Sequence, residues 1–75
     1  MAVRVFVTSW CQACKTELPK IREAANKLGV EVQITDVDRC PVNLKSKCEQ
    51  VEFVPTVFYE GREVSVQQLR KIAGL

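Results

Sequence analysis

The chain has 75 residues, of which 11 are basic, 9 are acidic, 4 are cysteine and none is histidine. This length predicts one domain over residues 1–75 with a thin core, because so small a domain buries only about 60% of the surface its extended chain exposes. Without histidine there can be no Ser-His-Asp triad, no Cys-His pair and no histidine-ligated metal. The net charge of +2, spread over scattered side chains, gives no argument for a nucleic-acid partner.

No stretch approaches the roughly 20 apolar residues that a membrane-spanning helix needs. The first residues run directly into a strand-like pattern and lack the apolar region of a secretory signal. We therefore expect a cytoplasmic, monomeric protein with no membrane partner. In such a chain, cysteines are more often redox-active or metal-binding than structural.

The first predicted element is a strand, in which Val3, Val5 and Val7 alternate with Arg4 and Phe6. After a loop of residues 8–10, a helix is predicted. Its apolar face repeats at spacings of 4, 3, 4 and 3 residues and consists of Cys14, Leu18, Ile21, Ala25 and Leu28.

Gly29 is expected to cap this helix, and Pro19 to bend it near its first turns. Alternation of Val30, Val32 and Ile34 predicts a second strand. Strand, helix and strand in succession form a βαβ unit, so the two strands should be parallel with a right-handed crossover.

The second half begins with a short helix predicted over Pro41–Glu49, with an apolar face of Leu44, Cys48 and Val51. Residues 54–59 predict a third strand that starts at a proline, Glu60-Gly61 a tight turn, and residues 62–64 a returning strand. Ser65 and Gln68 form a capping box for a last helix that ends at Gly74. Its core-facing positions are Val66, Leu69, Ile72 and Ala73.

The predicted order is β-α-β-α-β-β-α. We expect an α/β fold with a four-stranded mixed sheet and helices on both faces, the first and third helices on one face and the second on the other.

Cys11 and Cys14 lie where the first strand passes into the first helix. Unpaired N–H groups and the helix dipole favour a thiolate there, so the pKa of Cys11 should fall below the value of about 8.5 for a free cysteine. Cys14 lies one turn on, near enough to close a small disulfide, and starts the apolar face. Cys11 is therefore the expected exposed nucleophile and Cys14 the buried resolving thiol. The alternatives are a chance Cys-x-x-Cys and half of a zinc site.

The segment Trp10-Cys11-Gln12-Ala13-Cys14-Lys15 resembles the thioredoxin active-site sequence Trp-Cys-Gly-Pro-Cys-Lys. Pro19 matches the helix proline of thioredoxins, and Val54-Pro55-Thr56 is similar to their Ile-Pro-Thr segment. The small size resembles glutaredoxins and short redoxins instead. The resemblance implies a thioredoxin-like fold and a thiol–disulfide oxidoreductase that needs no cofactor or metal and serves electron transport and cell redox homeostasis.

The resemblance also implies site roles beyond the two cysteines. Pro55 would follow a cis peptide bond, which turns the Val54 backbone toward the substrate. A substrate peptide could pair with that backbone as an added strand, beside Thr56. Trp10 would form an apolar wall next to Cys11. The implied partners are protein disulfides and an electron donor, either a thioredoxin reductase-like enzyme or glutathione.

Two departures from the resemblance bear on the chemistry. Val5 stands where thioredoxins carry a buried aspartate, so the proton acceptor for Cys14 is unidentified, with water as the default. The stretch from Gly61 to Ser65 lacks the Gly-Gly turn and the acidic residue with which glutaredoxins hold glutathione. This disfavours a glutathione-dependent glutaredoxin, which is retained as an alternative.

Cys40 and Cys48 lie outside the family pattern. In one continuous helix they would be about 12 Å apart along the axis, too far for a disulfide unless the helix is broken. We therefore expect Cys48 to be a core thiol and Cys40 a surface thiol with a secondary redox or regulatory role. A metal module of these two cysteines with Cys11 and Cys14, and a redox-silent interaction domain, are the remaining alternatives.

Overall fold

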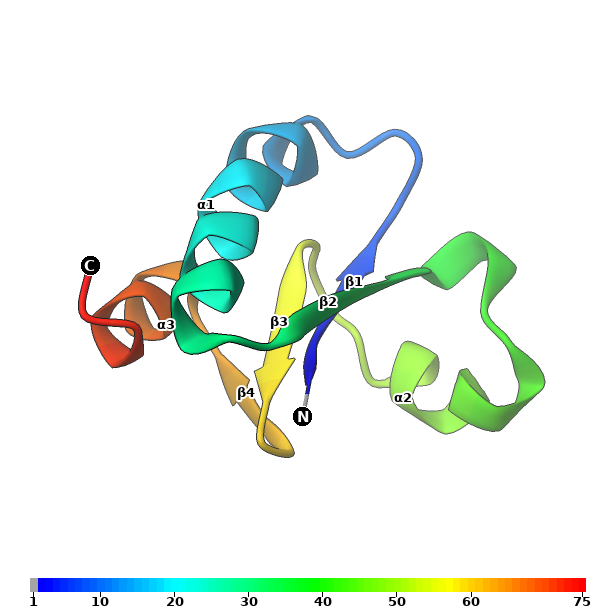
Figure 1. The fold of residues 1–75 in the computed structure, drawn as a ribbon. Helices are drawn as coiled ribbons and strands as arrows, with labels where there is room; N and C mark the ends of the chain where they lie inside the picture. Colours follow the sequence, from blue (N-terminus) through cyan, green and yellow to red (C-terminus); the bar gives the residue numbers. More distant parts are fainter. Residues whose placement is uncertain (1) are drawn as a thin grey trace.

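The computed structural model describes residues 2–75 (Figure 1). Its elements follow the predicted order, with two short 3-10 helices added. They are β1 (Ala2–Val7), α1 (Gln12–Leu28), β2 (Glu31–Asp36), η1 (Val37–Arg39), η2 (Val42–Leu44), α2 (Lys45–Glu49), β3 (Thr56–Tyr59), β4 (Arg62–Val64) and α3 (Val66–Ile72).

The four strands form one mixed sheet in the order β2-β1-β3-β4. β1 pairs with β2 in parallel, as the βαβ pattern predicts, with Val3 opposite Val32 and Val5 opposite Ile34. β3 runs antiparallel to both β1 and β4. Because Phe6 pairs with Thr56, the end of β1 and the start of β3 meet at the same edge of the sheet.

Helices α1 and α3 pack on one face of the sheet, and the segment from η1 to α2 lies on the other (Figure 1). This confirms the predicted distribution of helices. The core on the α1 side is built from fully buried apolar side chains: Val3, Val5, Ile21, Ala24, Ala25, Val57 and Leu69. Gly29 ends α1 with φ 73°, as predicted, and α1 runs without interruption through Pro19.

Two apolar positions are exposed, Ile34 in the predicted second strand and Ile72, which was predicted to face the core. Ile34 lies on β2, an edge strand with no neighbour on its outer side, so its side chain is only partly covered. Ile72 is in the last turn of α3, a helix too short to bury all its apolar positions. The capping box of Ser65 and Gln68 is confirmed, with hydrogen bonds of 3.0 and 2.8 Å.

The opposite face of the sheet carries Phe6 and Phe58, whose rings meet edge to face with centroids 5.6 Å apart. The ammonium group of Lys47 in α2 lies 5.1 Å from the centroid of Phe58. Lys47 therefore makes a cation–π contact that links α2 to the sheet.

The prediction of one continuous helix over Pro41–Glu49 is wrong. The segment instead forms η2 and then α2, with Leu44 between them at φ −112° and ψ 7°. The break brings the Cα atoms of Cys40 and Cys48 to 6.5 Å, and the two sulfur atoms are bonded. The expectations of a core thiol at Cys48 and a free surface thiol at Cys40 are therefore both wrong.

Candidate active site

Cys11 occupies the N-cap position of α1. Its backbone is extended, at φ −80° and ψ 110°, and its sulfur accepts a hydrogen bond from the N–H of Cys14 over 3.0 Å. This is the role that Ser, Asp or Asn usually plays at a helix start, because the first N–H groups have no partner within the helix. The same bond and the dipole of a 17-residue helix would favour negative charge on this sulfur.

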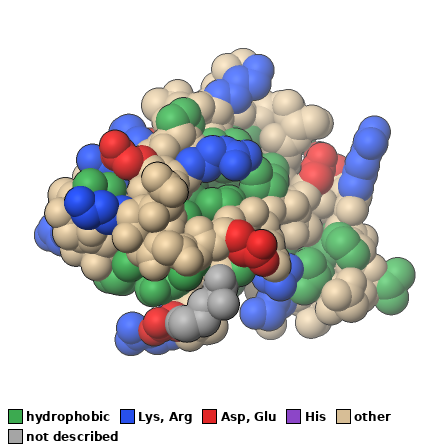
Figure 2. Space-filling model, viewed as in Figure 1, with side chains coloured by type: hydrophobic (Ala, Val, Ile, Leu, Met, Phe, Trp, Pro, Cys, Tyr) green, Lys and Arg blue, Asp and Glu red, His purple; other side chains and the backbone are tan. Residues whose placement is uncertain are grey.

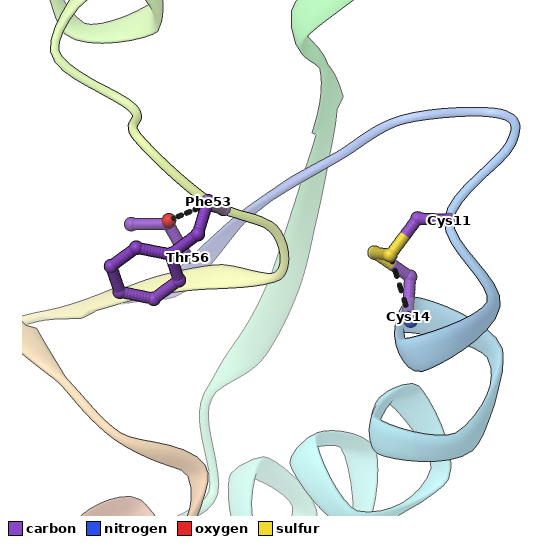
Figure 3. The surroundings of a disulfide bond; sticks show 4 residues. All are labelled: Cys11, Cys14, Phe53 and Thr56. Carbon is purple, nitrogen blue, oxygen red and sulfur yellow. Dashed lines mark hydrogen bonds between the residues drawn. A yellow bond between two sulfur atoms is a disulfide. The ribbon is translucent and has the colours of Figure 1, made fainter.

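The two cysteines are joined in a disulfide, with Cα atoms 5.3 Å apart (Figure 3). Their spacing at the helix start therefore allows the bond that the sequence predicted. Cys14 is 3% exposed, as expected for the first residue of the apolar face, but Cys11 is only 6% exposed. The expectation of an exposed Cys11 is wrong for this disulfide form, in which the side chain turns back over the first turn to cap it.

The loop that enters β3 faces this disulfide. The Val54–Pro55 peptide bond is cis, as the resemblance implied. The hydroxyl of Thr56 donates to the carbonyl oxygen of Phe53, which closes the loop on itself, and Figure 3 shows this loop beside the two cysteines. The strand register explains why this loop lies near the cysteine pair. The start of β3 and the end of β1, which leads to Cys11, lie at the same edge of the sheet.

A small apolar groove lies next to this loop, with a volume of about 190 Å³. We call it the tryptophan groove. Trp10 lines it with a side chain that is 71% exposed, so this side chain is not part of the core. The other lining residues are Thr8, Val37, Asp38, Val51, Glu52, Phe53 and Val54. Exposed aromatic side chains and two carboxylates therefore surround an apolar hollow.

The sequence-predicted substrate residues are not all in this groove. Trp10 and Val54 line it, whereas Pro55 and Thr56 line a neighbouring hollow of about 420 Å³ between the start of β3 and α3. Phe53 and Val54 line both, so the two hollows meet beside the residue whose backbone was expected to face a substrate.

Charged side chains around the molecule are mixed in sign. Figure 2 shows basic and acidic side chains interspersed, with hydrophobic side chains between them, on the face that it displays. Lys15, just after the cysteine pair, is exposed, and none of the described ion pairs involves it.

Val5 is fully buried, so the position of the thioredoxin aspartate is apolar in the structure as in the sequence. Among residues 2–75, the hydroxyl of Thr8 is the buried side-chain polar atom without a hydrogen-bond partner. Its backbone carbonyl accepts from the N–H of Cys11 at 3.3 Å, which ties Thr8 to the first cysteine of the pair.

The structure does not bring the four cysteines together. They form two separate disulfides, Cys11–Cys14 and Cys40–Cys48. Within residues 2–75 there is no group of three or more His, Cys, Asp and Glu side chains placed to hold a metal ion. The same residues include no helix long and apolar enough to cross a membrane.

Comparison with known proteins decides the family. Residues 1–73 match the family model described as Thioredoxin. The chain belongs to the thioredoxin family. Its four-stranded sheet with helices on both faces is accordingly a thioredoxin fold.

Among curated relatives of this thioredoxin-family chain is "Thioredoxin Y, chloroplastic" from Oryza sativa subsp. japonica. It is 29% identical over 59 residues, which cover 76% of the chain and 35% of the relative. The chain thus spans about a third of the length of that relative.

Solved structures of thioredoxins superpose over nearly the whole chain. Thioredoxin 1 from Thermosipho africanus TCF52B is 26% identical, with a TM-score of 0.73, covering 95% of this chain and 88% of that one. Oxidized thioredoxin O2 from Arabidopsis thaliana is also 26% identical, with a TM-score of 0.65, covering 97% of this chain and 71% of that one.

Sequence reasoning missed two features of this thioredoxin-family site. Val51 was predicted on a helix face and Phe53 was given no site role, yet both line the tryptophan groove. The Cys40–Cys48 bond was missed because a continuous helix was assumed, whereas the chain breaks between η2 and α2.

Proposed function

We propose that the protein is a thiol–disulfide oxidoreductase that reduces disulfide bonds in other proteins. The observation that carries this is the Cys11–Cys14 disulfide at the start of α1, with the N–H of Cys14 directed at the sulfur of Cys11. Membership of the thioredoxin family supports it. A structural disulfide would need no such placement at a helix N-terminus beside an exposed tryptophan.

The proposed cycle starts from the dithiol. The Cys11 thiolate attacks one sulfur of the substrate disulfide, forming a mixed disulfide and expelling the other substrate sulfur as a thiolate, which takes up a proton. Cys14 then loses its proton and attacks the sulfur of Cys11. This closes the Cys11–Cys14 disulfide and releases the second substrate thiol, so two electrons have passed to the substrate.

The buried position of Cys14 fits the resolving role. At 3% exposure, its thiol is protected from external disulfides but lies one helical turn from Cys11. Val5 supplies no carboxylate to receive its proton. The proposal therefore assigns this proton to water or to the departing substrate thiolate.

We place the substrate polypeptide across Val54, where the two hollows meet. Val54 precedes the β3 ladder, which begins at Thr56, so an extended substrate segment can pair with its backbone. Trp10 and Phe53 present exposed aromatic surface on one side of that segment. Pro55 and Thr56 bound the other side.

The electron donor that we propose is a thioredoxin reductase-like protein. The turn before α3 holds one glycine, Gly61, at φ 78°, followed by Arg62, Glu63 and Val64, and has no acidic residue at the start of the helix. Glutathione as donor, in the manner of a glutaredoxin, is the second candidate. We propose a cytoplasmic monomer, which the composition favours.

The test is reduction of insulin disulfides by the purified chain, coupled in one arm to a thioredoxin reductase with NADPH and in the other to glutathione with glutathione reductase. Turnover should appear with the first donor and vanish in Cys11→Ser. Turnover with glutathione alone would support the glutaredoxin alternative. Failure with both donors and with dithiothreitol, or full turnover by Cys11→Ser, would overturn the proposed function.

A further inference from the structure

The second disulfide lies at the two ends of one surface segment. Cys40 follows η1 and Cys48 lies within α2, so the bond closes a loop that contains η2. This whole segment lies on the face of the sheet opposite α1 and α3 (Figure 1). The bond is therefore remote in sequence and in layer from the helix that carries Cys11 and Cys14.

Two groups of residues that line the tryptophan groove flank this loop in sequence. One wall, Val37 and Asp38, belongs to η1 and ends two residues before Cys40. The other, residues 51–54, starts three residues after Cys48. The disulfide therefore links the chain at two points that lie between these two groove-lining segments in sequence.

Apart from the contact of the Lys47 ammonium group with the Phe58 ring on the sheet, few interactions hold this segment. None of the residues of η1, η2 and α2 is buried, and α2 has only five residues. Short backbone bonds, such as Val51 N–H to the Cys48 carbonyl at 3.2 Å, are local and tie no distant parts together. Because burial contributes little here, a covalent link has a large effect on how far the segment can move.

We propose that the Cys40–Cys48 disulfide is a positioning element for substrate binding: it holds Val37–Asp38 and residues 51–54 in register, so that a substrate polypeptide can dock beside Cys11. This rests on the proposed function of the Cys11–Cys14 pair. Cys40 and Cys48 exchange no electrons in the cycle. Their bond acts on the affinity for polypeptides and leaves the reactivity of Cys11 unchanged.

The test compares the wild-type chain with Cys40→Ala/Cys48→Ala, using reductase-coupled turnover so that no added dithiol opens the bond. Val42→Ala, an exposed position in the same loop, is the matched control. For insulin, the double variant should show a KM raised about fivefold or more with little change in kcat. For a small aromatic disulfide, which reaches Cys11 without filling the groove, its rate should match that of the wild type.

Amide hydrogen exchange gives a readout that does not depend on activity. In the double variant, exchange should speed up at residues 37–38 and 51–54, while β1 and α1 keep wild-type protection. Equal exchange in the groove walls, or an unchanged KM for insulin, would overturn the proposal. So would global unfolding or a parallel fall in the small-disulfide rate, because either would make the bond a general stabiliser.

The experiments distinguish a failure of the proposed function from a failure of the positioning role of the second disulfide. A wild-type chain that reduces no disulfide contradicts the proposed function, whereas the exchange comparison still decides whether the second disulfide holds the groove walls. An active wild-type chain whose double variant matches it in KM contradicts only the positioning role.

Discussion

The N–H of Cys14 donates to the sulfur of Cys11 across 3.0 Å, so the second cysteine of the pair stabilises the first through its backbone. The bond exists because Cys11 is the N-cap and Cys14 is the third residue of α1, the usual spacing between a capping side chain and the N–H it satisfies. The capping interaction of the helix and the proposed activation of the nucleophile are therefore one contact.

This contact predicts different reactivities for the two reduced thiols. A hydrogen bond to the charged form and the helix dipole both favour the Cys11 thiolate, so the pKa of Cys11 should lie below the value of about 8.5 for a free cysteine. At pH 7 the alkylation of Cys11 by iodoacetamide should therefore be faster than that of Cys14. Mass spectrometry of the alkylated chain measures this, and equal rates at Cys11 and Cys14 at pH 7 would refute it.

Trp10→Ala should impair substrate binding without affecting stability. The side chain is largely exposed and lines the tryptophan groove, so its loss removes contact area for a polypeptide but little of the core. We expect the KM for insulin to rise about tenfold, equivalent to ~1.4 kcal/mol. The denaturation midpoint should stay at the wild-type value, and a KM equal to that of the wild type would remove Trp10 from the site.

Two positions in α3 form a matched pair for testing the core. Leu69 is fully buried against α1 and the sheet, whereas Ile72 is 47% exposed, one turn further on. Leu69→Ala should lower the free energy of unfolding by about 2–5 kcal/mol. Ile72→Ala should lower it by much less, and urea denaturation of the two variants checks the difference. Similar losses would contradict the assigned packing of α3.

Thr8→Val tests the cost of an unsatisfied polar group. The Thr8 hydroxyl is buried without a hydrogen-bond partner, and valine has nearly the same shape without that group. Removing a buried unpartnered hydroxyl should raise the free energy of unfolding by roughly 1 kcal/mol. Thermal unfolding monitored by circular dichroism would show it as a higher Tm. A clear fall in Tm would mean that the hydroxyl has a partner in solution.

Much of the fold follows from the sequence because local patterns and the global fold agree. Alternating valines gave β1, a 3.6-residue apolar repeat gave α1, and Ser65 with Gln68 gave the start of α3, all of which the structure confirms. The exposure of Ile34 was not predictable from alternation, because its burial depends on β2 being an edge strand. The position of β2 in the sheet is a tertiary property, which the local sequence pattern does not determine.

The candidate site was likewise predictable only in part from the sequence. The Cys11–Cys14 pair was predictable because helix-start chemistry depends on neighbouring residues alone. The Cys40–Cys48 bond was not, because it requires the break at Leu44, and the assumption of a continuous helix placed the cysteines too far apart. The tryptophan groove was only half predictable, because residues 37–38 and 51–54 are distant in sequence and line the same groove only in the folded chain.

The central claim is that Cys11 attacks substrate disulfides and Cys14 resolves the product. Cys14→Ser tests it most directly, because this variant can form the mixed disulfide but cannot release it. Incubation of the reduced variant with insulin should yield a covalent complex that is stable without reductant and is linked through Cys11, as mapped by peptide mass spectrometry. Cys11→Ser under the same conditions should form none. A complex linked through any other cysteine, or no complex with Cys14→Ser, would contradict the account.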